Sequence, residues 1–66
     1  MNITVNGESR DVPDGLTVEG LLAHLAVDRK YTAVAVNREV TPRSAHASTY
    51  IADGDRVEIV RPMGGG

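Results

Sequence analysis

The sequence contains one stretch of clear helical periodicity, and the segments around it show the shorter period of β-strands. Val18, Leu21, Leu22 and Leu25 recur at i, i+3, i+4 and i+7, which places them on one face of a helix. Thr17 precedes them and is a suitable N-cap residue. Because a helix with one apolar face has to bury it against another element, the sequence predicts an α+β fold, with the helix on one face of a mixed sheet of four to five strands.

The strand signals are a hairpin pattern before the helix and an apolar run after it. Asn6-Gly7 is a strong signal for a two-residue hairpin turn, because both positions of a type I′ turn need positive φ. It joins a strand at 3–5 to a mostly polar strand at 8–12, whose charges suit a sheet edge. The near-continuous apolar run at 32–36 predicts a strand that is buried on both faces.

The second half of the chain carries further strand signals separated by turns. The segment 37–39 has turn chemistry, and a short strand is expected at Val40, limited by Pro42 because proline has no N–H for a ladder. Residues 44–50 are expected to form a loop or a short helical turn. The alternation in 56–60 predicts the last strand.

The expected core consists of the apolar residues that these periods place inward. They are Ile3, Val5, Leu16, Val18, Leu21, Leu22, Leu25, Val34, Val36, Ile51, Val57 and Ile59. No disulfide supplements this core, since the chain has no cysteine, and no metal site is expected, since His24 and His46 are far apart in sequence. Gly20 lies on the helix away from the apolar stripe, and the sequence shows no packing reason for it.

Composition excludes several classes of function. The chain has 66 residues, enough for one domain, and its net charge is −2 with scattered basic residues. Its only aromatic residues are two tyrosines, so it offers no stacking platform for nucleic acid. No apolar run approaches the ~20 residues that span a membrane. The N-terminus has no signal-peptide pattern, so a cytoplasmic protein without membrane partners is expected.

The three C-terminal residues, Gly64, Gly65 and Gly66, are the candidate site. Glycine loses more backbone entropy on ordering than any other residue, so we expect 64–66 to form a flexible tail after a domain at 1–63. This slim arm ends in one α-carboxylate, whose pKa of about 3.5 in peptides makes it an ionised oxygen nucleophile at neutral pH.

The order of these signals resembles the ubiquitin-like β-grasp fold, and more closely the ThiS-type sulfur carriers of thiamine biosynthesis within the ThiS/MoaD superfamily. The resemblance covers nearly the whole chain, although three glycines stand where the family requires two, and Thr41 stands where valine is frequent. The similar stretches are Asn6-Gly7, Leu16-Thr17-Val18, Leu21-Leu22, Ala33-Val34-Ala35-Val36-Asn37, Val40-Thr41-Pro42-Arg43, Asp53-Gly54-Asp55-Arg56-Val57-Glu58-Ile59-Val60 and Gly65-Gly66.

The resemblance implies a mechanism at Gly66. A ThiF-type adenylating enzyme, related to the ubiquitin-activating enzymes, would use ATP to adenylate the Gly66 carboxylate. A sulfur donor such as a cysteine desulfurase would then convert the adenylate to a thiocarboxylate, and a ThiG-type thiazole synthase would receive the sulfur. Gly65 and Gly64 would let the arm enter partner active sites. The chain would be a cosubstrate and not an enzyme, with no catalytic residue, metal or bound cofactor of its own.

Two questions stay open at this stage. Val60, Pro62 and Met63 flank the tail and are candidates for a small apolar docking patch, whereas the alternative is that Val60 packs locally and Met63 is loose. The rival functions are a small subunit of molybdopterin synthase, a ubiquitin-like protein modifier and a plain β-grasp interaction module. The first two would use the same diglycine end.

Overall fold

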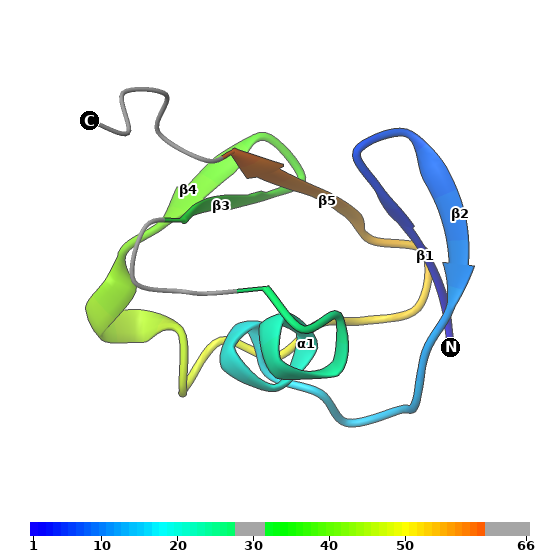
Figure 1. The fold of residues 1–66 in the computed structure, drawn as a ribbon, viewed down its shortest axis with the longest axis horizontal. Helices are drawn as coiled ribbons and strands as arrows, with labels where there is room; N and C mark the ends of the chain where they lie inside the picture. The colour runs from blue at the N-terminus through cyan, green and yellow to red at the C-terminus, as the bar shows by residue number, and fades with distance from the viewer. Residues whose placement is uncertain (28–31, 61–66) are drawn as a thin grey trace.

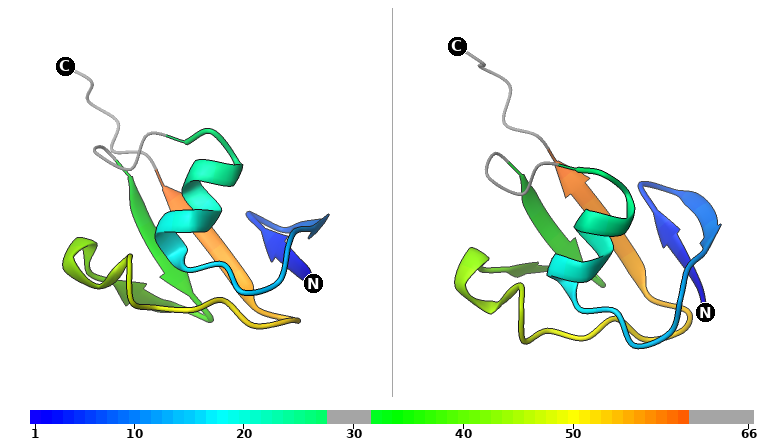
Figure 2. Two further views of the ribbon diagram at one scale, coloured as in Figure 1. Left: turned by 90° about the horizontal axis from the view of Figure 1, so that it is seen from below. Right: turned by 60° about the horizontal axis from the view of Figure 1, so that its bottom comes forward.

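The computed structural model describes residues 1–27 and 32–60, which form a five-stranded mixed sheet with a helix on one face (Figure 1; Figure 2). The predicted α+β arrangement is therefore confirmed. In chain order the elements are β1 (Asn2–Val5), β2 (Glu8–Asp11), α1 (Val18–His24), β3 (Ala33–Val36), β4 (Glu39–Thr41), the short 3₁₀ helix η2 (Arg43–Ala45) and β5 (Arg56–Val60).

The sheet has the strand order β2-β1-β5-β3-β4, which places the last strand in the middle. β5 pairs in parallel with β1 and antiparallel with β3, and Val57 lies opposite both Val5 and Val36. The hairpins β1–β2 and β3–β4 flank it, so β2 is the edge strand that the sequence predicted. The two halves of the sheet are joined through β5.

Each hairpin closes through two residues with positive φ. In the first, Val5 pairs with Glu8 around Asn6 at φ 51° and Gly7 at φ 84°, which confirms the predicted turn.

In the second hairpin, Val36 pairs with Glu39 around Asn37 at φ 53° and Arg38 at φ 69°. The turn therefore occupies 37–38, and Glu39 already belongs to β4, one residue earlier than the sequence indicated.

The N-terminus of α1 is capped by the Thr17 side chain and by the backbone carbonyls of His46 and Thr49. The Oγ1 of Thr17 accepts a hydrogen bond of 3.0 Å from Gly20 N–H, as the sequence predicted. Val18 N–H donates to the carbonyl of Thr49 at 2.8 Å, and Glu19 N–H donates to that of His46 at 3.0 Å. The segment after η2 thus packs against the start of the helix.

The helix ends in a Schellman motif without glycine. Val27 N–H donates to Leu22 O at 2.9 Å, and Ala26 N–H donates to Ala23 O at 3.1 Å. Ala26 takes φ 58°, a conformation that usually selects glycine at this position.

The core between α1 and the sheet consists mainly of the predicted residues. The buried apolar residues are Ile3, Val5, Val12, Val18, Leu21, Leu22, Val34, Ile51 and Val57. Leu16, Leu25, Val36 and Ile59 are partly buried against them. Val12 and the buried His46 were not predicted as core members.

Two interpretations of the sequence are wrong. β3 is not buried on both faces, because Val34 is buried whereas Ala33 is exposed. Gly20 does have a packing neighbour, since a Cβ there would lie 3.3 Å from Leu16 Cδ2, closer than an ordinary contact. Alanine at this position would therefore displace the Leu16 side chain.

Candidate functional site

The candidate site is the segment that continues from the end of β5. Gly64, Gly65 and Gly66, together with Pro62 and Met63, lie outside the described residues, so the structure does not place them. Of the predicted site residues it places Val60, the last residue of β5. What the fold contributes to the site is therefore the position and support of this strand end.

Val60 lies in an apolar patch on the sheet face opposite α1. Directly paired residues in neighbouring strands point to the same face, and Val60 pairs with Ala33 while Ala35 pairs with Val40. Val60 is 59% exposed and Val40 is 70% exposed. These four residues form the outer-face patch, and the exposed Glu58, which pairs with Ala35, borders it. The side chain of Val60 is therefore not packed in the core, and its role in docking stays a prediction.

The β1 side of the end of β5 is held by the side chain of Asn6. The Oδ1 of Asn6 accepts a hydrogen bond of 2.8 Å from Ile59 N–H, and its Nδ2 donates to Ile59 O at 3.2 Å. The backbone N–H of Asn6 also donates to Val57 O at 2.9 Å. One turn residue therefore contacts both polar backbone groups of Ile59, one residue before Val60.

The other side of β5 is held in a similar way at its beginning. The Oδ1 of Asn37 accepts from Arg56 N–H at 2.9 Å, and Asn37 N–H donates to Arg56 O at 2.7 Å. The Nδ2 of Asn37 donates to Asp55 Oδ1 at 3.0 Å. Asp55 in turn accepts from Ala52 N–H through Oδ2 at 2.8 Å, which closes the turn before β5.

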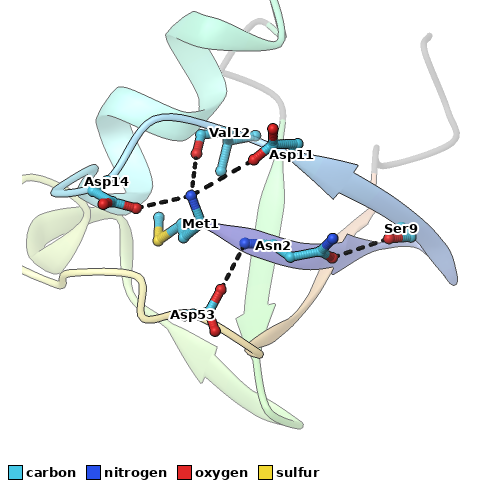
Figure 3. Close-up of polar contacts among 7 residues, drawn as sticks. All are labelled: Met1, Asn2, Ser9, Asp11, Val12, Asp14 and Asp53. Carbon is cyan, nitrogen blue, oxygen red and sulfur yellow. Dashed lines mark hydrogen bonds and ion pairs between the residues drawn. The ribbon is translucent and has the colours of Figure 1, made fainter.

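The N-terminal ammonium group is a charged centre with three partners (Figure 3). It donates to the carbonyl of Val12 at 2.7 Å and lies 2.8 Å from Asp14 Oδ1 and 3.7 Å from Asp11 Oδ1. The hydrogen bond with Asp14 raises the pKa of the Met1 amine above its ordinary value of 8.0, and the charges of Asp14, Asp11 and Asp53 raise it further. Burial acts in the opposite direction.

The polar groups beside this ammonium support the sheet. Asn2 N–H donates to Asp53 Oδ1 at 2.7 Å, and Ser9 Oγ donates to Asn2 Oδ1 at 3.0 Å (Figure 3). These contacts tie β1 to β2 and to the turn that precedes β5. They satisfy polar groups of the fold and leave no unpaired nucleophile in this corner.

The two histidines lie in different surroundings. His24 is exposed, as expected, and lines an open groove of about 590 Å³ together with Asn6, Arg10 and Leu25. His46 is buried and donates its Nε2–H to the carbonyl of Thr41, 3.2 Å away. Within the described part of the chain, no three His, Cys, Asp or Glu residues gather in a way that could hold a metal ion.

The sequence indicated turns at Asn6 and Asn37 but not their contacts with β5, which lie near the site for Asn6 and at the opposite end of the strand for Asn37. Their signal was available in part, because asparagine is common where φ is positive. The second role of each asparagine, in which its side chain bonds to β5, depends on the three-dimensional arrangement.

In residues 1–27 and 32–60, no helix is both long and apolar enough to cross a bilayer.

The comparisons with known proteins agree on one family. The model of the ThiS family matches residues 3–66. The crystal structure of a thiamine biosynthesis protein (ThiS) from Geobacter metallireducens superimposes with a TM-score of 0.88 at 43% identity, and all of both chains is covered.

Curated relatives extend the match to proteins of two sizes. The sulfur carrier protein ThiS of Escherichia coli is 30% identical over the full length of both chains. A thiazole synthase of Paramagnetospirillum magneticum is 44% identical over 66 residues, and one of Magnetococcus marinus is 35% identical. The chain covers 20% of the length of each of these two synthases.

Proposed function

Since the chain belongs to the ThiS family and is a sulfur carrier of thiamine biosynthesis, we propose that its sulfur is carried as a thiocarboxylate on Gly66. The observation that carries this proposal is that the family match extends through the C-terminal glycines, to residue 66. The absence of cysteine supports it, because no thiol in this sequence could bear a transferable sulfur.

The first step is activation of the carboxylate. An oxygen of the Gly66 carboxylate attacks the α-phosphate of ATP in the active site of a ThiF-type enzyme, and pyrophosphate leaves. The product is an acyl adenylate, in which AMP is a good leaving group. The carrier supplies the nucleophile, while the partner binds ATP, so the carrier needs no cofactor of its own.

The second step exchanges AMP for sulfur. A persulfide sulfur from a cysteine desulfurase attacks the acyl carbonyl and displaces AMP, which forms an acyl disulfide. A further thiol then attacks the sulfur of the desulfurase cysteine and breaks the S–S bond. The transferred sulfur stays on the carrier as the thiocarboxylate, and a disulfide forms on the donor side. Gly64 and Gly65 have no side chains that could obstruct entry of the arm into these active sites.

We further propose a ThiG-type thiazole synthase as the acceptor of the sulfur. Support comes from the two thiazole synthases that match this chain along its whole length while being about five times as long. The outer-face patch is the proposed docking surface, together with Pro62 and Met63, because Val60 in this patch directly precedes the arm in the sequence. We propose a cytoplasmic location for this reaction, as expected from the absence of a signal-peptide pattern at the N-terminus.

The intact mass of the carrier tests the mechanism. Incubation with the adenylating enzyme, ATP and sulfide should raise the mass by the difference between sulfur and oxygen. Deletion of Gly65 and Gly66 should abolish this shift and leave the circular dichroism spectrum unchanged. A full shift in the truncated protein would overturn the mechanism.

The acceptor is tested separately. The thiocarboxylate form should yield thiazole product with thiazole synthase. Conversion of a pterin precursor instead, with the large subunit of molybdopterin synthase, would favour the molybdopterin alternative. Conjugates between Gly66 and lysine side chains would favour the protein-modifier alternative.

A further inference from the structure

We propose that Asn6 is a positioning residue for the sulfur-transfer reaction, in that its side chain holds the strand end from which the C-terminal arm begins. This inference rests on the proposed function, because it assigns Asn6 a role in presenting the Gly66 carboxylate. The role depends on two hydrogen bonds between the Asn6 side chain and Ile59 near the end of β5, 53 residues away along the sequence.

The end of β5 has no partner strand on the β1 side. β1 pairs with β5 only as far as Val5, opposite Val57, and the chain then turns away through Gly7 into β2. Backbone groups of alternate strand residues point to the same side, so those of Val57 and Ile59 both face β1. Ile59 lies beyond the last paired residue of β1 on this side.

The side-chain amide of Asn6 takes the place of this missing partner strand. A carboxamide carries one acceptor and one donor group, as a peptide unit does. Its Oδ1 accepts from Ile59 N–H at 2.8 Å and its Nδ2 donates to Ile59 O at 3.2 Å. The left-handed φ of 51° at Asn6 lets the backbone turn away while the side chain continues the ladder.

The C-terminal arm follows directly from the strand end that Asn6 supports. Val60 is the last residue of β5, and Ile59 is the last described residue whose polar backbone groups are held on the β1 side. Without the Asn6 amide, the backbone of this end would be held by the pairing with β3, through Ala33 and Val60. Fraying of this end would leave the origin of the arm undefined, and binding to the adenylating enzyme would then have to order it again.

Asn37 provides a matched control. It has nearly the same φ as Asn6, also precedes the second residue of a two-residue turn, and also makes two side-chain hydrogen bonds with residues 55–56. Its contacts lie at the opposite end of β5. Removing either amide should weaken the fold, but only removal of the Asn6 amide should loosen the origin of the arm.

The experiment compares Asn6→Gly with Asn37→Gly, since glycine tolerates positive φ and both substitutions remove the same side chain at the same turn position. Steady-state adenylation is measured by pyrophosphate release with the ThiF-type enzyme of the same host, well below the melting temperature of each variant. Because fixing the backbone of one residue changes an equilibrium by about 5- to 30-fold, we expect Asn6→Gly to raise KM for the carrier by about that factor with kcat unchanged. Asn37→Gly should leave both constants unchanged.

Amide hydrogen exchange gives a second readout that needs no partner. The Ile59 amide should exchange faster in Asn6→Gly, and the Arg56 amide should exchange faster in Asn37→Gly. Equal KM values for the two variants, whether both are raised or both unchanged, would overturn the positioning role while the reaction of the wild-type carrier upholds the proposed function. If the wild-type carrier is not adenylated, the proposed function fails and the positioning role fails with it.

Discussion

The two hairpins of the sheet use the same turn geometry at opposite ends of one strand. Asn6-Gly7 closes the first hairpin and Asn37-Arg38 closes the second, and all four residues have positive φ. In both turns the asparagine side chain bonds to β5, at Ile59 in one case and at Arg56 in the other. The comparison shows that a hairpin turn here both reverses the chain and fixes a neighbouring strand.

The hairpins differ in the second residue of the turn. Gly7 has no Cβ and adopts its φ of 84° without strain, whereas Arg38 holds a left-handed conformation that is unfavourable for a residue with a side chain. The first turn is therefore stable by local chemistry. The second depends more on the contacts that Asn37 makes with β5.

They differ also in what their strands bury. The first hairpin and the residue that follows it contribute Ile3, Val5 and Val12 to the core. β4, the outer strand of the second hairpin, buries Thr41 but exposes Val40. Both hairpins therefore contribute an inner strand to the core, with Val34 in the second, and the second hairpin also forms part of the outer-face patch.

The largest expected effect tests this difference in burial. Ile3 is 1% exposed, so Ile3→Ala should destabilise the protein by about 2–5 kcal/mol through lost burial and a residual cavity. Val40→Ala, at a residue 70% exposed, should change the free energy of unfolding by less than about 0.5 kcal/mol. Urea denaturation followed by circular dichroism measures both. Similar losses in the two variants would mean that burial does not distinguish these two positions.

A smaller effect tests the turns. Gly7→Ala should destabilise the protein by about 1 kcal/mol, because the added Cβ meets nothing within 4 Å and the penalty is backbone strain alone. Arg38→Gly should stabilise it by up to about 1 kcal/mol, because relief of strain outweighs the added freedom of the unfolded chain. Thermal unfolding of the two single variants and the double variant is the measurement. A loss of stability in Arg38→Gly would show that the arginine side chain makes a contribution that outweighs the strain.

The smallest effect tests whether the N-terminal ammonium anchors the first hairpin alone. The pKa of Met1 is higher in the folded protein than in the unfolded chain, so its stabilisation is fully present below about pH 8 and is lost as the pH rises through the folded value. Hydrogen exchange of the Val12 amide, which donates to Met1 O, should lose protection over that range relative to amides of β4. Asp14→Asn should reduce this pH dependence. Equal behaviour of the two hairpins would show that the ammonium does not act locally.

Much of the fold could be predicted because local chemistry and tertiary structure agree. The period of Val18, Leu21 and Leu22, the cap at Thr17 and the Asn6-Gly7 turn each follow from nearby residues, and each is confirmed. The family was likewise identified from the order of such signals along the chain.

The errors arise where distant residues decide the outcome. Val12 follows a polar strand, yet its amide pairs with Met1 O and its side chain is buried. His46 is buried because its segment packs across the start of α1, which no local pattern indicates. The β3 prediction failed because alanine satisfies both an exposed and a buried position. At the site, Gly66 and its neighbours remain predictions, and the support from Asn6 required the sheet to be known.

The central place of β5 also bears on synthesis of the chain on the ribosome. The two hairpins are complete by residue 41, but the strand that joins them is translated after all other described elements. Until then the contacts between β1 and β5 cannot form, so a nascent or prematurely terminated chain would expose two unjoined hairpins to proteases. Completion of the sheet therefore requires translation through β5, and the fold itself selects against products that stop before this strand is complete.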